Sequence, residues 1–510
     1  GITIPNPNHF AISGSSGGPL SILNNKFLGN SDFFSGAFPS EYGNSTAGVF
    51  DLKIRNGNSE KTEFTGQVGL FGAELLMEGP LSKKSSASYL LMYRKATLRI
   101  FDLLGLDLGT SAIPNYQDFA AKVNFPFKKG GNLSLWALGG NSNIEILISE
   151  QTDSTQIDLY GENTKDQRFG TGMLVGGATY TKPLNETAFI KSTTCVNLEQ
   201  QLSKHDTVSR GGNWTDVSLA PYMAYNFNKI RYSNASSFNK KLNKKNTLKI
   251  GWVADFTNFS FIDSATTNSA LQTYRYRFNK KGSCFMIQPY VSWKHKFSDD
   301  LVLTAGLTSL YLNLGDSFSP IEPRMGMKWN LSDKGALSFG LGYHSQTQPL
   351  YTRYYINEGN TSSHNENLGL TYSKHVVLGY SHQLNKNFGV KTEAYYQDLT
   401  GIPVETSPSA FSLTNAGSGF ARVFPDTLEN TGAGYNYGLE VTIQRYFNKN
   451  WHALFSGCLY NSRYTPSDGI ERNTSFNGIY AANFLAGREF QIKNNTLGLG
   501  IKVTGAGGKR

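Results

Sequence analysis

The chain has 510 residues, of which 39% are hydrophobic and 13% aromatic, and its formal net charge is +10. No stretch approaches the ~20 consecutive apolar residues of a membrane helix, and Cys195, Cys284 and Cys458 have neither disulfide-scaffold nor zinc-site spacing. Many lysines sit in short turns rather than on one face, so the positive charge does not indicate a nucleic-acid partner.

Strand-forming residues dominate the composition. The chain contains 27 Tyr, 33 Phe and 53 Gly, and its mean hydropathy is only −0.35. We therefore expect a nearly all-β protein. In a membrane barrel only alternate residues face lipid, which keeps the mean hydropathy low. A soluble propeller or a row of β-sandwiches would have a similar composition, so composition alone does not separate these folds.

Residues 1–58 come first and differ from the rest of the chain. The extended run 1–10 contains Pro5 and Pro7, and a Gly/Ser-rich stretch follows at 13–18. This stretch lacks the GxxxxGK[ST] pattern and a following helix, so it does not indicate a phosphate-binding loop. The segment ends in a strand-like run at 48–55.

From residue 59 onward, apolar and small or polar residues alternate in many segments. Leu337, Phe339 and Leu341 alternate with serine and glycine, and the segments 439–444 and 497–503 follow the same pattern. A period of two is what a barrel wall requires, since one face meets lipid and the other meets water.

Short turn clusters rich in Lys, Asn, Asp and Gly separate these segments. They lie at 82–85, 128–132, 182–185, 243–246, 298–300, 332–335, 384–387, 447–450 and 493–495. Longer connections alternate with them, at 101–115, 148–166, 266–280, 355–368, 404–432 and 465–477. Short turns on one rim and long loops on the other are typical of bacterial outer-membrane barrels, with the short side periplasmic. The irregular spacing disfavours a propeller, whose blades recur at a near-constant length.

The turns predict the number of strands. Nine short turns and the strand pair before the first give about nineteen strands over 59–510. Because such barrels have even strand numbers and an open edge cannot lie in lipid, we expect about three further strands beyond 505–510, which resembles part of a rim loop. The intact protein would then have 22 strands, a size associated with plugged transporters rather than open porins.

Several motifs resemble those of TonB-dependent outer-membrane receptors. Residues 38–53, beginning Phe-Pro-Ser-Glu-Tyr-Gly, resemble the closing segment of the plug, and residues 1–10 resemble the family's strand and apical loop. The resemblance continues through the wall at 78–84, 321–324, 342–346, 393–397 and 437–440. The pattern is nearest to the Bacteroidota branch, whose members often carry an amino-terminal carboxypeptidase-like regulatory domain.

This resemblance implies a transmembrane antiparallel β-barrel at 59–510, lacking its last three or so strands. It also implies that 1–58 is the carboxyl-terminal half of a plug domain within the lumen. The expected function is active import of a siderophore, vitamin, oligosaccharide or peptide across the bacterial outer membrane. Expected partners are a periplasmic TonB-type coupling protein, outer-membrane lipid or lipopolysaccharide, and a possible surface lipoprotein. The TonB box, the signal segment and the first half of the plug are absent from this sequence.

Two groups of residues are candidate ligand contacts. The first group lies at the expected plug apex, and the alternative to ligand contact there is a structural turn fixed by Pro5 and Pro7. The second group follows a strand toward the long-loop rim, and the alternative there is an interfacial belt of tyrosines. The candidates are Asn6, Asn8, His9, Phe10, His344, Gln346, Gln348, Tyr351 and Arg353.

No enzymatic reading is supported by the sequence. His344 and Ser345 are neighbours on a predicted strand and therefore point to opposite faces, and the eight histidines show no metal-binding spacing. We expect no catalytic residues, metal or cofactor. Two alternatives to active import stay open: a passive porin, and a surface-assembly protein that uses the barrel only as an anchor.

Overall fold

The computed structural model describes residues 1–13, 17–18, 20–69, 72–83, 85–97, 114–151, 162–212, 214–268, 273–315, 317–417 and 422–508. The amino-terminal segment, residues 1–58, forms two small antiparallel hairpins. The first joins β1 (Asn8–His9) to β2 (Leu20–Ser21), and the second joins β3 (Asp32–Phe34) to β4 (Val49–Asp51).

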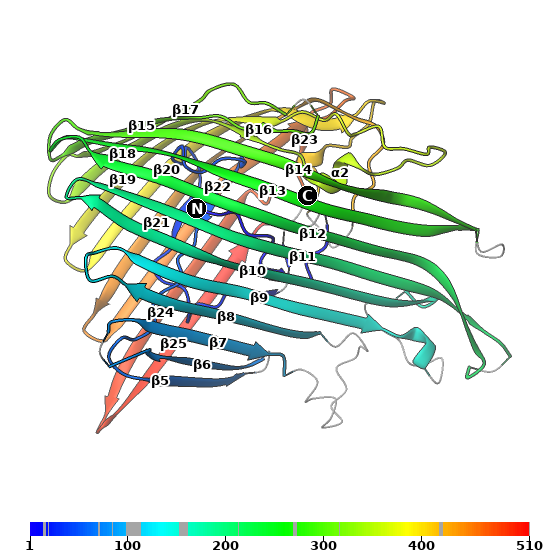
Figure 1. The fold of residues 1–510 in the computed structure, drawn as a ribbon, viewed down its shortest axis with the longest axis horizontal. Coiled ribbons are helices and arrows are strands. Elements are labelled where there is room, and N and C mark those ends of the chain that lie inside the picture. Colours follow the sequence, from blue (N-terminus) through cyan, green and yellow to red (C-terminus); the bar gives the residue numbers. More distant parts are fainter. Residues whose placement is uncertain are drawn as a thin grey trace.

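The remainder of the chain forms one long antiparallel wall (Figure 1). Over the described ranges it contains nineteen strands, in agreement with the sequence-based expectation. They are β5 (Glu63–Gly69), β6 (Gly72–Pro80), β7 (Ser88–Lys95), β8 (Asn115–Pro126), β9 (Asn132–Ile146), β10 (Lys165–Asn185), β11 (Ala188–Arg210), β12 (Val217–Lys241), β13 (Asn246–Asn268), β14 (Thr273–Lys296), β15 (Leu301–Thr308), β17 (Glu322–Asn330), β18 (Gly335–Gln346), β19 (Thr371–Asn385), β20 (Phe388–Glu405), β21 (Leu428–Asn448), β22 (Trp451–Thr465), β24 (Tyr480–Ile492) and β25 (Asn495–Ala506).

Small elements lie between the wall strands, on the long-loop side. They are η1 (Ile148–Glu150), β16 (Tyr311–Leu312), α2 (Leu350–Arg353), η2 (Leu413–Asn415) and β23 (Arg472–Asn473). None of the helices in the described part of the chain is long and apolar enough to cross a membrane.

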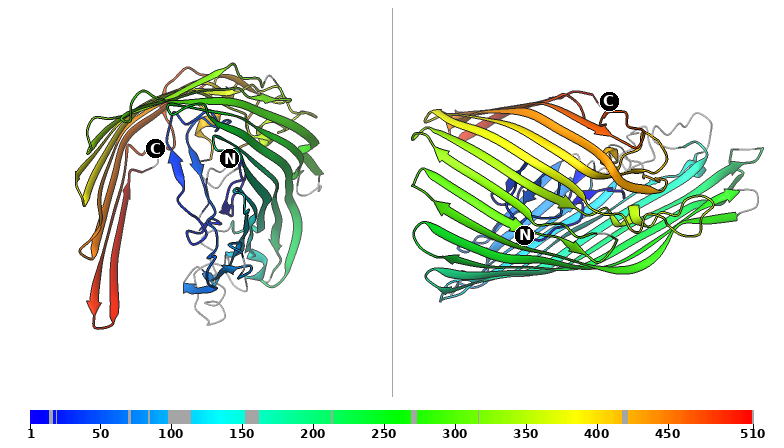
Figure 2. Two further views of the ribbon diagram at one scale, coloured as in Figure 1. Left: turned by 60° about the vertical axis from the view of Figure 1, so that its left-hand side comes forward. Right: turned by 90° about the horizontal axis from the view of Figure 1, so that it is seen from above.

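The wall curls around the amino-terminal segment (Figure 2). Every successive pair of wall strands from β5 to β25 has a defined antiparallel register, as in the long pairing of β11 with β12. Although the strand order brings β25 next to β5, no register among the described residues joins these two strands. Figure 2 accordingly shows β5 and β25 as the two edges of a curled wall, and β25 is exposed throughout its length.

The two rims differ as the sequence predicts. All nine predicted turn clusters lie at or beside the short connections of one rim, with Lys84 outside the described residues. Of the predicted long loops, 101–113, 152–161, 269–272 and 418–421 lie outside them too. The expectation of a loop over 266–280 is wrong, because β13 continues to Asn268 and β14 begins at Thr273. Strand β21 likewise begins at Leu428, inside the predicted loop 404–432.

Alternation divides the wall into two faces. Val196, Leu198 and Leu202 on β11 are exposed on the outer face, whereas Cys195 and Asn197 on the same strand are buried on the inner face. The other long strands repeat this pattern, which gives the wall an apolar outer band and a polar inner face. This is the division of a transmembrane barrel.

Exposed tryptophans mark one edge of the apolar band. Trp252 lies near the start of β13, and Trp293 and Trp329 lie near the ends of β14 and β17. Trp451 opens β22, so all four lie close to the short-turn rim. Tryptophan favours the boundary between the apolar and polar parts of a membrane, because its ring is apolar and its N–H is polar.

Replacing Val196 by arginine would place a charge in the middle of the apolar band. We expect the free energy of unfolding in lipid vesicles to fall by about 2–4 kcal/mol, as for charges near the midplane of other barrels. The same substitution at Ser209, an exposed residue at the long-loop end of β11, should cost about 0–1 kcal/mol. Equal losses for the two variants in urea titrations would contradict the position of the band.

Candidate functional site

His9, Phe10 and Arg55 of the amino-terminal segment are fixed to the wall by polar contacts. Asp118 on β8 accepts from Arg94 at 2.8 Å and contacts His9 Nε2 at 3.1 Å, and the side chains of His9 and Asp118 have no solvent exposure. The backbone N–H of Phe10 donates to Ser142 Oγ at 3.0 Å. Arg55 forms a bidentate pair with Glu78, with both distances 2.7 Å. The segment is therefore held by inward-facing side chains of β6 to β9.

Residues 38–42 of the segment are held separately, by Arg324 on β17. Its Nη1 donates to the carbonyl oxygens of Phe38 (3.4 Å), Pro39 (3.2 Å) and Tyr42. The guanidinium lies 4.9 Å from the Phe38 ring centroid and donates to Glu322 at 2.8 Å. Arg324 and Glu322 are both nearly inaccessible to solvent, so they form a desolvated ion pair. Arg324 thereby holds the segment through its backbone carbonyls rather than through its side chains.

Strands β18 to β20 complete this contact, which we name the latch (residues 37–46 and the wall side chains that hold them). His375 accepts from the Ala37 N–H at 3.0 Å through Nδ1, so its Nε2 carries the proton donated to the Thr46 carbonyl at 3.0 Å. Thr46 Oγ1 donates to Gln346 at 2.7 Å, and Asn44 accepts from the Thr347 N–H at 2.7 Å.

Aromatic contacts fill the centre of the latch. The ring centroid of Phe38 lies 4.1 Å from that of His344, which lies 4.3 Å from that of His375. Phe38 and His344 have no solvent exposure. Burial, followed by the nearby Asp51 carboxylate, raises the pKa of the Tyr42 hydroxyl.

Residues 347–370, here named the inward loop, connect β18 to β19 and fold against the inner face of the wall. The guanidinium of Arg353 is inaccessible and donates to the Glu366 carbonyl and to Ser317 Oγ, both at 2.9 Å. Gln348 Nε2 donates to the Gly369 carbonyl at 3.0 Å. The bonds to Glu366 and Gly369 close the loop on itself, and the bond to Ser317 ties it to the connection before β17.

An aromatic cluster seats the inward loop. Tyr354 stacks on Phe259 with centroids 5.2 Å apart, and Tyr355 lies 5.6 Å from Phe278. Burial, followed by the Glu366 carboxylate, raises the pKa of Tyr354 to about 12. The members of the cluster are Tyr225, Phe227, Phe259, Phe261, Phe278, Tyr354 and Tyr355.

A cavity of about 270 Å³ lies where the segment, the wall and the inward loop meet. Pro5 and Asn44 line it from the amino-terminal segment, and residues 346–350 line it from the inward loop and the end of β18. The wall contributes Asn197, Glu199, Lys229, Arg231, Asp255, Thr257, Cys284, Met286 and Leu312. A molecule bound here would contact all three parts of the protein at once.

The nine candidate residues are not brought together. Gln346 and Gln348 line the cavity. Four of the others are anchored: His9 and Phe10 to the wall, His344 in the latch, and Arg353 within the inward loop. Asn8 donates to Asn6 at 2.6 Å and belongs to strand β1, while Tyr351 packs against the aromatic cluster.

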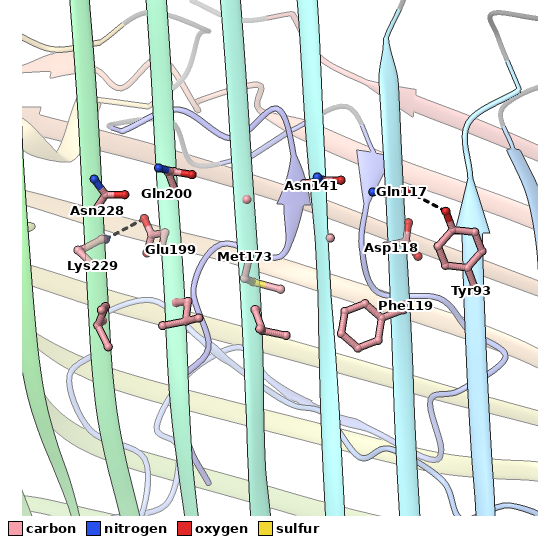
Figure 3. Close-up of a pocket in the computed structure, with 15 residues that line it drawn as sticks. Tyr93, Gln117, Asp118, Phe119, Asn141, Met173, Glu199, Gln200, Asn228 and Lys229 are labelled. Atoms are coloured by element: carbon pink, nitrogen blue, oxygen red, sulfur yellow. Dashed lines mark hydrogen bonds and ion pairs between the residues drawn. The ribbon is translucent and has the colours of Figure 1, made fainter.

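A second hollow, of about 650 Å³, lies on the wall at β7 to β12 (Figure 3). Figure 3 shows Gln117, Asn141, Gln200 and Asn228 as a row of amides at one level of adjacent strands. Apolar side chains exposed on the outer face, such as Phe119, lie next to the row. The lining also includes inward residues such as Asp118 and Glu199, so this hollow is defined by residues from both faces of the wall.

Comparison with known proteins shows which solved structures share this fold. No protein-family model and no curated protein matches the chain. Among solved structures it resembles the FrpB iron transporter from Neisseria meningitidis (F3-3 variant), with 13% identity, a TM-score of 0.66 and coverage of 95% of this chain and 76% of that one. The outer membrane transporter YddB from Escherichia coli gives 12% identity, a TM-score of 0.62 and coverage of 99% and 81%. The ferric-catecholate import receptor Fiu from K12 E. coli gives 10% identity and a TM-score of 0.61, with coverage of 89% of this chain and 73% of that one.

The chain has the fold of TonB-dependent outer-membrane receptors. The family-like motifs at 38–43, 321–324 and 342–346 are far apart in sequence, yet all three meet in the latch. Sequence reasoning recognised these motifs separately and missed their convergence. It also missed Asp255, Asn197 and Arg231, because each is a single polar residue in an alternating strand.

Replacing Arg324 by methionine should loosen the latch, because three carbonyl oxygens lose their donor and Glu322 loses its counter-ion. We expect amide hydrogen exchange within 37–46 to rise at least tenfold, which corresponds to about 1.4 kcal/mol. Lys328 is an exposed residue on the same strand, and Lys328→Met is the matched control. Unchanged exchange in the Arg324 variant would show that the latch does not hold the segment.

Proposed function

We propose that this protein imports a scarce or bulky nutrient across the bacterial outer membrane, with residues 1–58 as the gate. The observation that carries the proposal is the position of this segment. It lies within the curled wall and is held by inward-facing side chains, from Glu78 on β6 to Gln397 on β20 (Figure 2). A wide lumen needs such an obstruction to prevent free diffusion.

In this proposal residues 1–58 are the carboxyl-terminal half of a plug, and residues 59–510 belong to a barrel of 22 strands in the intact protein. A periplasmic TonB-type protein supplies mechanical work, because the outer membrane has no nucleotide supply of its own. Outer-membrane lipid surrounds the apolar band, and a surface lipoprotein is a further partner in this proposal. A Bacteroidota origin and an additional regulatory domain are part of the same proposal.

The latch suits a gate that must release under force. Arg324 holds three backbone carbonyls of the segment, and His375 holds one N–H and one carbonyl. These bonds are short-ranged, so a displacement of a few ångströms breaks them together. After release, Arg324 keeps Glu322 as its ion-pair partner, which lowers the cost of exposing the inner wall and lets the latch re-form.

The cavity is the proposed ligand site. Gln346 and Gln348 are the two sequence candidates that we retain as ligand contacts, since both line it. We assign anchoring roles to Asn8, His9, Phe10, His344, Tyr351 and Arg353, and we leave Asn6 beside the apex turn. The solved neighbours include a ferric-catecholate import receptor and an iron transporter. Siderophores, vitamins, oligosaccharides and peptides all remain within the proposed class of nutrients.

A reversible tether tests the gate. A Cβ built on Gly36 lies 3.1 Å from Val377 Cγ2, so the pair Gly36→Cys and Val377→Cys places two sulfurs within disulfide reach. In a planar bilayer, the protein should conduct little at rest and should open when urea loosens the segment. The oxidised pair should stay closed in the same urea concentration, and a reducing agent should restore opening. Each single cysteine variant is the control.

The same recordings separate the alternatives. A large, steady conductance at rest, unaffected by the tether, would identify a passive porin and defeat the gate. Failure to open in urea, with or without the tether, would favour a surface-assembly protein that uses the wall as an anchor.

A further inference from the structure

The cavity is lined by buried polar atoms that have no hydrogen-bond partner in the described part of the chain. Asp255 is 3% exposed, and neither of its carboxylate oxygens has a hydrogen-bond partner among the described residues. The same holds for Asn197 Oδ1 and Arg231 Nε, and Asn197 is 2% exposed. All three residues line the cavity. Because burying a polar atom without a partner costs free energy, such a group in a cavity indicates a bound molecule that completes it.

The register of three adjacent strands brings these groups together. Asn197 on β11 is opposite Arg231 on β12, and Arg231 is opposite Thr257 on β13. Asp255 lies two residues from Thr257 on the same face, so it is a diagonal neighbour of Arg231. The guanidinium is partly engaged, since its Nη2 donates to the Thr3 carbonyl at 2.5 Å. No ion pair between Asp255 and Arg231 occurs in the described ranges.

The charges that line the cavity balance. Lys229 pairs with Glu199 at 2.9 Å, and Asp255 offsets Arg231, so two formal positive charges meet two negative ones. A neutral group that both donates and accepts hydrogen bonds therefore suits this site better than a free ion. The described residues also contain no group of three or more His, Cys, Asp or Glu that could hold a metal.

Two adjacent hydroxyl groups have the required chemistry. A carboxylate can accept two hydrogen bonds side by side, one at each oxygen, and a pair of neighbouring O–H groups supplies both donors. The hydroxyl oxygens can in turn accept from the Arg231 Nε–H. An ammonium group would satisfy Asp255 but would oppose the guanidinium. A volume of about 270 Å³ equals roughly nine water molecules, so one ring unit of a larger nutrient fits.

We propose that this cavity binds the vicinal diol of a neutral nutrient, as carried by sugars or by free catechols. Asp255 and Asn197 accept from the hydroxyl groups, and Arg231 donates to them. Arg231 also holds Thr3 of the amino-terminal segment, so the diol and the gate share one side chain. This inference rests on the proposed import function, because it takes the cavity to be the nutrient site of a gated wall.

Equilibrium binding of the purified full protein tests the inference. The probes are an array of neutral oligosaccharides and free catechol, with titration calorimetry on each probe that binds. Wild-type protein should bind one of these two sources of diol. Asp255→Asn should weaken that binding at least tenfold, or about 1.4 kcal/mol, whereas Asp398→Asn, on the opposite face of a distant strand, should leave it unchanged. Arg231→Lys keeps the charge but removes Nε and should weaken binding as well.

The remaining outcomes overturn the inference. They are no binding of any neutral oligosaccharide or catechol, or equal binding by wild type and by an Asp255→Asn variant with an unchanged urea unfolding midpoint. Lysine-containing peptides serve as a further set of probes, and binding of one of them instead of a diol would also overturn the inference. Diol binding combined with ungated conductance would leave the inference standing and defeat the import proposal. Gated conductance without diol binding would overturn the inference and leave the import proposal standing.

Discussion

Backbone hydrogen bonding in the absence of water is the constraint on which this structure depends. Inside a lipid layer each N–H and C=O must find a partner within the protein, and a β-strand finds partners only on its neighbours. The successive antiparallel registers from β5 to β25 meet that requirement for every strand pair within the wall. Once the strands are paired, alternation sends one set of side chains outward and the other inward.

The inner face creates a second problem, because its charged and polar side chains need partners. The amino-terminal segment supplies many of them: Asp118 meets His9, Glu78 meets Arg55, and Arg324 meets the carbonyls of 38–42. The contacts that neutralise the wall are therefore the contacts that obstruct the lumen. At Asp255 the wall offers a carboxylate that the segment leaves without a partner, and this distinguishes the cavity from the anchoring contacts.

The same constraints explain why the fold persists at 10–13% identity to solved receptors and transporters. Strand pairing asks only for alternation and tight turns, which many sequences satisfy. The latch is equally tolerant on the segment side, since Arg324 binds backbone carbonyls that any residue carries. Specificity for a nutrient then rests on a few inward side chains and on the inward loop.

The amino-acid sequence by itself determined the class of fold, because alternation and turn chemistry are local properties. Segments such as 337–343 and the nine turn clusters predicted nineteen strands and two unlike rims. The rim loops were less predictable: Thr273 to Lys280 reads as polar, yet it extends β14 because Phe278 packs into the aromatic cluster. Only the tertiary structure decided that His9 is a buried anchor, that Arg353 closes the inward loop, and that Asn197, Arg231 and Asp255 face one cavity. Those outcomes depend on the register between strands and on contacts between residues distant in the sequence, such as His9 and Asp118, which no local pattern encodes.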